Sequence, residues 1–318
     1  MRQTGKIVYL DQNAWIDLAK SDKKTRTFVT NLSENGAAIF PLSLAHVEET
    51  SRISNPQRRQ KLASLMVEVS RGYSFSPLLR TIIEMEVRQL VMERRRLPFS
   101  DLRKNVLGKG MGHLVGAEPK IEWSPTGINP SQTEKLKKEM LSMLDTPDSL
   151  LLILTTVRRP PFYPKVDANG VEKLEKIRKD FLRIKDNALR RRAIFTKFLL
   201  DFMTPILARV SYEMQLPTDF FIKKGSTEQD FRDLLDSVPT ALCFFTLLLE
   251  RDQQLQRPIQ ANDLNDIWTL SLAIPYSHIV VTENMWVSIS QQTKIDRKCR
   301  TLLLTSIKEL LKHLQNPR

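Results

Sequence analysis

Acidic residues stand where strands or helices of this chain are expected to begin or end. Asp11 directly follows the apolar run KIVYL, and Glu283 follows a second run, HIVVT. Asp263 and Asp266 lie three residues apart at the start of a helical pattern, which places both on one helix face. Glu49 stands early in another helical pattern. Several converging carboxylates of this kind are the ligands that Mg²⁺ and Mn²⁺ prefer.

One element explains how these acids could meet. Residues 7–10 form a continuous apolar run with β-branched and aromatic members, which is typical of a strand buried on both faces of a parallel sheet. The carboxyl ends of parallel strands share one edge, and ligands of open α/β sheets bind there. We therefore expect Asp11 and the later acids to meet at that edge.

The two aspartates at 263 and 266 allow more than one interpretation. An aspartate at a helix start, such as Asp263, is more often a cap than a ligand when it is taken alone. Two carboxylates on one helix face repel each other unless a cation lies between them or one of them points to solvent. Because both aspartates are expected at the sheet edge with the other acids, we favour a cation between them over a carboxylate that points to solvent.

The helix after the second strand offers two glutamates, Glu48 and Glu49. We choose Glu49 because it shares a helix face with His46, three residues earlier. His46 either orients Glu49 or is a buried, hydrogen-bonded histidine. At the other end of the chain, Glu283 and Asn284 compete for the last ligand position, and we choose Glu283.

Other familiar catalytic patterns are missing from the sequence. The segment GKGMG lacks the full phosphate-binding loop pattern and follows no expected strand. The two cysteines have no metal-binding spacing, and the four histidines form no HxH or HExxH motif. The sequence therefore indicates neither a zinc hydrolase nor a disulfide framework.

The chain is strongly basic, with a net charge of +13 and a pI near 9.8. Such an excess raises the chance of a polyanionic partner such as nucleic acid. Two arginine triplets stand out, and they are either solvated helix faces or phosphate-contacting surfaces. They comprise Arg94, Arg95, Arg96, Arg190, Arg191 and Arg192.

No signal-peptide pattern precedes the first strand, and the longest apolar runs are too short for the roughly 20 residues that a membrane span needs. We expect a cytoplasmic protein with no membrane association.

The chain is expected to have an α/β fold in two parts. Strand, helix, strand and helix patterns alternate up to about residue 70, with Ser43 as the cap of the second helix. Helical patterns without a convincing strand then dominate as far as about residue 225. The last part returns to α/β, with a strand at HIVV and a closing helix around TLLLTSIKELLKHL. We expect domain segments at 1–70 and 226–318, separated by a helical insertion at 71–225.

The ordered set VYLDQNAW, PLSLAHVEET and NDLNDIWTLSLAIPYSHIVVTENMW resembles the PIN-like nuclease family. The resemblance covers the two flanking segments and not the middle. It implies a central parallel sheet flanked by helices, here interrupted by a large, mainly α-helical insertion. One departure is that Glu283 follows Thr282 directly, whereas small PIN toxins usually have one residue between the threonine and the last acid.

The resemblance also implies an activity, which is Mg²⁺- or Mn²⁺-dependent hydrolysis of phosphodiester bonds in nucleic acid, with RNA favoured over DNA. The implied catalytic and metal-binding residues are Asp11, Glu49, Asp263, Asp266 and Glu283, with Asn13 and Thr282 as supports. We add His46 to these supports because of its helix spacing to Glu49. Free-standing members of the family are often toxins or defence effectors, so an antitoxin or a second copy of the chain is a candidate partner. The rival hypothesis is a non-catalytic nucleic-acid-binding or scaffolding protein with the same fold.

Overall fold

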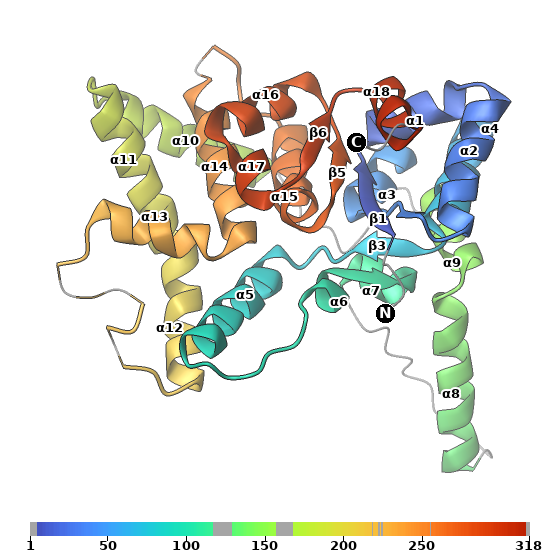
Figure 1. The fold of residues 1–318 in the computed structure, drawn as a ribbon, viewed down its shortest axis with the longest axis horizontal. Helices are drawn as coiled ribbons and strands as arrows, with labels where there is room; N and C mark the ends of the chain where they lie inside the picture. Colours follow the sequence, from blue (N-terminus) through green and yellow to red (C-terminus); the bar gives the residue numbers. More distant parts are fainter. Residues whose placement is uncertain are drawn as a thin grey trace.

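The computed structural model of the 318-residue chain describes residues 5–116, 129–156, 168–217, 219–221, 223, 225–254 and 256–315. A four-stranded parallel sheet lies within a mostly helical molecule, in the strand order β2-β1-β5-β6 (Figure 1). The strands are β1 (Lys6–Leu10), β2 (Ala38–Ile39), β5 (Ile279–Val281) and β6 (Leu302–Leu304). The α/β class and the parallel sheet agree with the sequence prediction.

The register of the two central strands fixes the edge on which the acids lie. Leu10, the last residue of β1, is paired with Val281, the last residue of β5. The amide of Asp11 then donates to the carbonyl of Val281 over 3.0 Å. Because the strands are parallel, the residues that follow each of them emerge at the same edge.

Helices connect the strands and account for most of the described residues. The first segment contains α1 (Gln12–Lys20), α2 (Lys23–Glu34), α3 (Leu44–Ser51) and α4 (Pro56–Ser70). The middle contains α5 (Leu79–Arg94), α6 (Arg103–Val106), α7 (Gly110–Val115), α8 (Pro130–Leu144), α9 (Pro147–Thr156), α10 (Ala168–Leu182), α11 (Asn187–Phe198), the π-helix η1 (Leu199–Met203) and α12 (Thr204–Glu213). The last segment contains α13 (Glu228–Asp236), α14 (Pro239–Gln253), α15 (Ala261–Tyr276), α16 (Asn284–Thr293), α17 (Ile295–Cys299) and α18 (Ile307–Gln315).

Two expectations about strands were wrong. The middle of the chain contains an antiparallel pair, β3 (Tyr73–Phe75) and β4 (Leu107–Lys109). Each strand has only three residues, which is too short to produce a visible alternation in the sequence. The segment TLLL was expected to belong to the closing helix, but residues 302–304 form β6 and the helix begins at Ile307. A short leucine run is compatible with either a buried strand or a helix. Here its residues pair with β5 and therefore form a strand.

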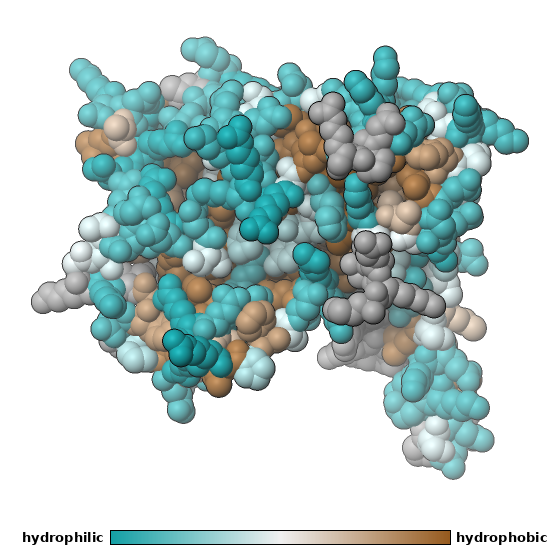
Figure 2. Space-filling view, in the orientation of Figure 1, coloured by the Kyte–Doolittle hydropathy of each residue, from teal (hydrophilic) through white to brown (hydrophobic). Residues whose placement is uncertain are grey.

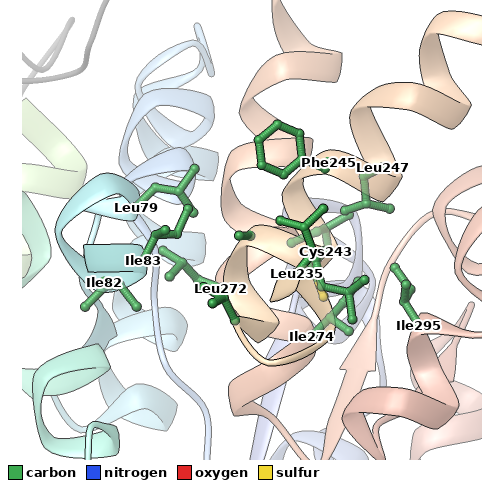
Figure 3. Packing of buried hydrophobic residues seen from close by; sticks show 14 of the residues in the cluster. Leu79, Ile82, Ile83, Leu235, Cys243, Phe245, Leu247, Leu272, Ile274 and Ile295 are labelled. Atoms are coloured by element: carbon green, nitrogen blue, oxygen red, sulfur yellow. The ribbon is translucent and has the colours of Figure 1, made fainter. Parts of the chain in front are cut away.

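Each face of the sheet carries its own hydrophobic core. Side chains alternate along β1, so Ile7 and Tyr9 belong to one core and Val8 and Leu10 to the other. The first core contains buried residues of α5, α11, α12, α14, α15 and α16, and Figure 3 shows part of its packing. The second contains buried residues of α1, α2, α3, α4, α7, α9 and α18.

The middle segment contributes to both cores. Ile83 of α5 and Ile206 of α12 are buried on one side, whereas Leu114 of α7 and Leu154 of α9 are buried on the other. These helices therefore help to cover the sheet. Helix α8 is an exception, since it extends away from the body of the molecule (Figure 1).

The face shown in Figure 2 is largely hydrophilic, with smaller hydrophobic patches between the charged side chains. In the described part of the chain, no helix combines the length and the apolar character that crossing a bilayer requires.

Candidate active site at the sheet edge

The five acids chosen from the sequence all line one pocket of about 250 Å³ at the carboxyl edge of the sheet. Asp11 follows β1, Glu49 lies on α3, Asp263 and Asp266 lie on α15, and Glu283 follows β5. The pocket is also lined by the three supporting residues, Asn13, His46 and Thr282. Residues separated by more than 270 positions in the chain thus meet in space.

Asp11 is held in place by the start of the helix that it caps. Its carboxylate accepts a hydrogen bond from the amide of Ala14 over 2.8 Å, which satisfies one of the free amides at the start of α1. Burial, together with the nearby charge of Glu283, raises the pKa of Asp11 to about 6, although hydrogen bonds from Ala14 and the Thr282 hydroxyl favour the charged form. Thr282 thus touches the acid that it was expected to support.

Glu283 is the more exposed member of the cluster. Its carboxylate accepts a hydrogen bond from the side-chain amide of Asn13 over 2.9 Å. Asn13 therefore supports Glu283, and this contact links the first turn of α1 to the loop after β5. Asn284, the alternative to Glu283, is exposed and is the first residue of α16.

The two neighbouring glutamates of α3 have different partners. Glu48 is in an ion pair with Arg52 and accepts from the side-chain amide of Asn265 over 3.0 Å. Glu49 lines the pocket instead. Burial and, after it, the charges of Asp266 and Asp11 raise the pKa of Glu49 to about 8.

Asp266 is anchored by a buried aromatic side chain. The indole N–H of Trp286 donates to its carboxylate over 3.1 Å, and Trp286 itself is completely buried. Burial raises the pKa of Asp266 to about 7, and Glu283 and Asp11 contribute through their charges. Asp11, Glu49 and Asp266 are thus close enough to resist one another's ionisation.

Asp263 has a different environment, although it also lines the pocket. One carboxylate oxygen accepts from Arg251 over 2.7 Å and from the amide of Gln260 over 2.8 Å, and the other accepts from Arg257 over 3.1 Å. Asp263 therefore caps α15 and neutralises a buried arginine. Both of its oxygens thus have partners within the protein, so Asp263 has a structural role at the pocket wall, and its expected role as a metal ligand stays a prediction.

His46 is a buried, hydrogen-bonded histidine, which was one of its two expected roles. Its Nδ1 accepts from the amide of Ser43 over 2.9 Å, so the proton lies on Nε2, which donates to the carbonyl of Leu10 over 2.9 Å. Burial lowers its pKa to about 3, so the ring stays neutral. His46 thus connects the start of α3 to the end of β1 and fixes the turn of helix that carries Glu49.

Two further pocket residues were missed in the sequence. Gln12 is 6% exposed, and its amide nitrogen donates to Thr50 over 3.0 Å. Its carbonyl oxygen is buried and has no hydrogen-bond donor among the described residues. Arg257 is the second, and it is the basic member of the pocket lining. Gln12 follows Asp11 directly and could have been noticed, whereas nothing in the sequence places Arg257 here.

The arginine triplets lie outside this pocket, since none of the six residues lines it. Arg94 and Arg95 stack over the ring of Phe220, at 5.7 and 6.0 Å from its centre. Arg191 is in an ion pair with Glu250 and Arg192 with Glu228, while Arg190 contacts Asn187. Arg96, at the end of α5, has a left-handed backbone conformation with φ of 57°. Their role in nucleic-acid binding stays a prediction.

The pocket offers oxygen donors of the kind that a hydrated divalent cation uses. Asp11, Glu49, Asp266 and Glu283 offer carboxylate oxygens, and Gln12 offers a carbonyl oxygen that lacks a donor. Mg²⁺ keeps several of its waters and uses one or two carboxylates directly. Within the described ranges, no group of three or more His, Cys, Asp or Glu side chains is arranged so that it could hold a metal ion as it stands.

Comparisons with protein-family models, with curated proteins and with solved structures find no match to this chain.

Proposed function

We propose that this protein is a Mg²⁺- or Mn²⁺-dependent endoribonuclease of the PIN-like type, with its active site in the acidic pocket. The observation that carries the proposal is that Asp11, Glu49 and Asp266 line one pocket at the sheet edge, where burial and neighbouring carboxylates raise the pKa of each. A fold tolerates such a cluster at a cost in stability, and perturbed carboxyls in a cleft are typical of functional sites.

We assign each acid a role in catalysis from its position in the pocket. Asp11 and Asp266 are the buried acids at the centre, and they would hold the cation together with Glu283. Such an ion, when bound, neutralises charge that develops on the phosphate and lowers the pKa of water. Glu49 lines the same pocket and is not assigned to the cation, so we assign it, as the carboxylate, the proton of the attacking water.

The neutral neighbours keep the acids in position. Asn13 holds the carboxylate of Glu283, and Trp286 holds that of Asp266. Thr282 and the amide of Ala14 contact Asp11. The proposal needs no serine, cysteine or histidine nucleophile, and the neutral, buried His46 acts only on the position of α3.

Cleavage of labelled single-stranded RNA tests the proposal. We expect the wild type to cut RNA in Mn²⁺, EDTA to abolish cutting, and Asp11→Asn to lower the rate by at least about 100-fold, the effect typical of removing a main electrostatic contact. Asp17→Asn changes an exposed acid of the same helix and serves as the matched control. Cutting that persists in Asp11→Asn would refute the assignment, and single-stranded DNA in parallel tests the preference for RNA.

The proposal includes a biological setting, a cytoplasmic toxin or defence effector. Expression of the wild type should then arrest growth of a host cell, while Asp11→Asn expressed at the same level should not. Equal growth of cells carrying the two proteins would remove the toxin role.

A further inference from the structure

An arginine lines a pocket whose other charged residues are acids. Arg257 lies in the loop between α14 and α15, and its side chain is 44% exposed. Its guanidinium contacts Asp263 over 3.1 Å. The acids of the pocket alone would repel a phosphodiester, so a cation at this wall affects whether such a substrate can enter.

The backbone of Arg257 is held by two other arginines. Buried Arg251 donates to the carbonyl of Arg257 over 3.2 Å and to that of Pro258 over 2.7 Å. Buried Arg178, from α10, donates to the same carbonyl of Arg257 over 3.2 Å and also to Gln254. Burying two guanidinium groups is costly. Both guanidinium groups hold the same loop position, that of Arg257.

The acid that contacts Arg257 is fixed in the same way. Asp263 is 2% exposed and pairs with Arg251, which is 1% exposed. Glu175 of α10 pairs with Arg178 and also accepts from the amide of Ile259 over 2.8 Å. Helix α10 of the middle segment therefore helps to position a loop of the acidic pocket.

The guanidinium of Arg257 still has donors to offer. It carries five N–H groups, and its acceptors among the described residues are Asp263 and the sulfur of Met285. An arginine that served only to neutralise an acid would not need this exposure, because Arg251 already pairs with Asp263 from within the core. A planar fork with spare donors matches two oxygens of a phosphate group.

From these contacts we infer that Arg257 binds a backbone phosphate of a polynucleotide substrate beside the acidic cluster. The inference rests on the proposed nuclease function, which it extends by naming a residue that touches the substrate. Arg251, Asp263 and Arg178 are positioning residues in this arrangement. Helix α10 thereby gives part of the middle segment a role at the active site.

Steady-state cleavage of fluorescent single-stranded RNA in Mn²⁺ tests this inference with Arg257→Gln, Arg257→Lys and the control Arg80→Gln. Arg80 is exposed on α5 and does not line the pocket. For Arg257→Gln we expect KM to rise about tenfold and more than kcat falls, as for the loss of one charged phosphate contact. Arg257→Lys should recover part of the loss, and the melting temperature should stay near that of the wild type.

The salt dependence gives a second readout that a structural role would not change. The slope of log KM against log salt should fall by about 0.7 in Arg257→Gln, the value for one phosphate contact to a single strand. Arg80→Gln should keep the slope of the wild type.

The outcomes separate this inference from the proposed function. If the wild type cuts RNA and Asp11→Asn does not, while Arg257→Gln keeps the KM and salt slope of the wild type, the inference is wrong and the nuclease stands. If Arg257→Gln loses activity together with melting temperature and Arg257→Lys restores neither, the role is structural and the inference is also wrong. If the wild type fails to cut RNA, both are refuted.

Discussion

Asp263 is paired with Arg251 over 2.7 Å inside the protein, whereas Asp266, one helical turn further along α15, lies in the acidic cluster. Two aspartates on one helix therefore have opposite electrostatic surroundings. Removing the charge of Asp263 leaves a buried guanidinium without its partner, which typically costs about 3–5 kcal/mol. Removing the charge of Asp266 relieves repulsion.

We accordingly expect Asp263→Asn to lower the free energy of unfolding by about 3–5 kcal/mol. Asp266→Asn should leave it unchanged or raise it at pH 8, while abolishing RNA cleavage. Urea unfolding of the two variants measures this, and each serves as the control for the other. Equal destabilisation by both substitutions would contradict the division of roles.

Divalent cations should stabilise the protein, and more so at high pH. The pKa values of Asp11, Asp266 and Glu49 are raised to about 6, 7 and 8, so the folded protein keeps protons that the unfolded chain has lost. Without metal, the contribution of these groups to stability falls as pH rises from about 4 to 8. A cation needs the deprotonated carboxylates and offsets this loss.

In a thermal melt at a Mg²⁺ concentration about 100 times its dissociation constant, we expect the ion to stabilise the protein by about 2.7 kcal/mol. The effect should be larger at pH 8 than at pH 6 and should be absent from Asp11→Asn. Stabilisation that is the same at both pH values, or that survives in Asp11→Asn, would indicate binding elsewhere.

The sequence was sufficient to predict that the acids meet at one edge of the sheet, because each stands beside a local strand or helix pattern. Apolar runs ending in Asp11 and Thr282-Glu283 indicate strand ends, and the parallel arrangement brings strand ends to one edge. The environment of Asp263 could not be predicted in the same way. Its partners, Arg251 and Arg257, lie at the end of one helix and in the loop that follows, and only the folded chain shows which of them is buried.

The missed strands have a related cause. The three-residue strands β3 and β4 are too short for a pattern, and β6 has a leucine run that also suits a helix. Contacts between distant segments determined their structure. The position of α10 is another such case, since Arg178 reaches the carbonyls of a loop more than 75 residues away.

Gln12 provides a test of the proposed cation site that does not remove an acid. Its carbonyl oxygen is buried without a donor, a situation that costs about 1–3 kcal/mol. We expect Gln12→Met to keep or raise the melting temperature and to weaken Mn²⁺ binding several-fold, as measured by calorimetry. Gln57→Met, at an exposed position of α4, is the control. Unchanged Mn²⁺ affinity in Gln12→Met would show that this oxygen faces no ligand.

Glu86 should make the stability of the protein depend on pH in a way that does not involve the acidic pocket. This buried residue of α5 accepts from the amide and hydroxyl of Thr240 and from the hydroxyl of Tyr276. Burial raises its pKa to about 7, so its contribution to stability is lost as pH rises from about 4.5 to 7. The free energy of unfolding of Glu86→Gln relative to wild type should therefore rise by roughly 3 kcal/mol between pH 4.5 and pH 8.

Glu34→Gln, at the exposed end of α2, is the matched control for this series and should show no comparable trend. A difference between Glu86→Gln and the wild type that stays constant across this pH range would mean that Glu86 is charged in the folded protein throughout.

The central claim is that acids from distant parts of the chain form one cation site, and anomalous diffraction from crystals soaked in Mn²⁺ tests it most directly. We predict a manganese peak inside the pocket, in contact with or one water away from Asp11 and Asp266, and its loss in Asp11→Asn crystals soaked in the same way. Manganese bound elsewhere on the protein, with no peak in this pocket at saturating concentration, would contradict the account.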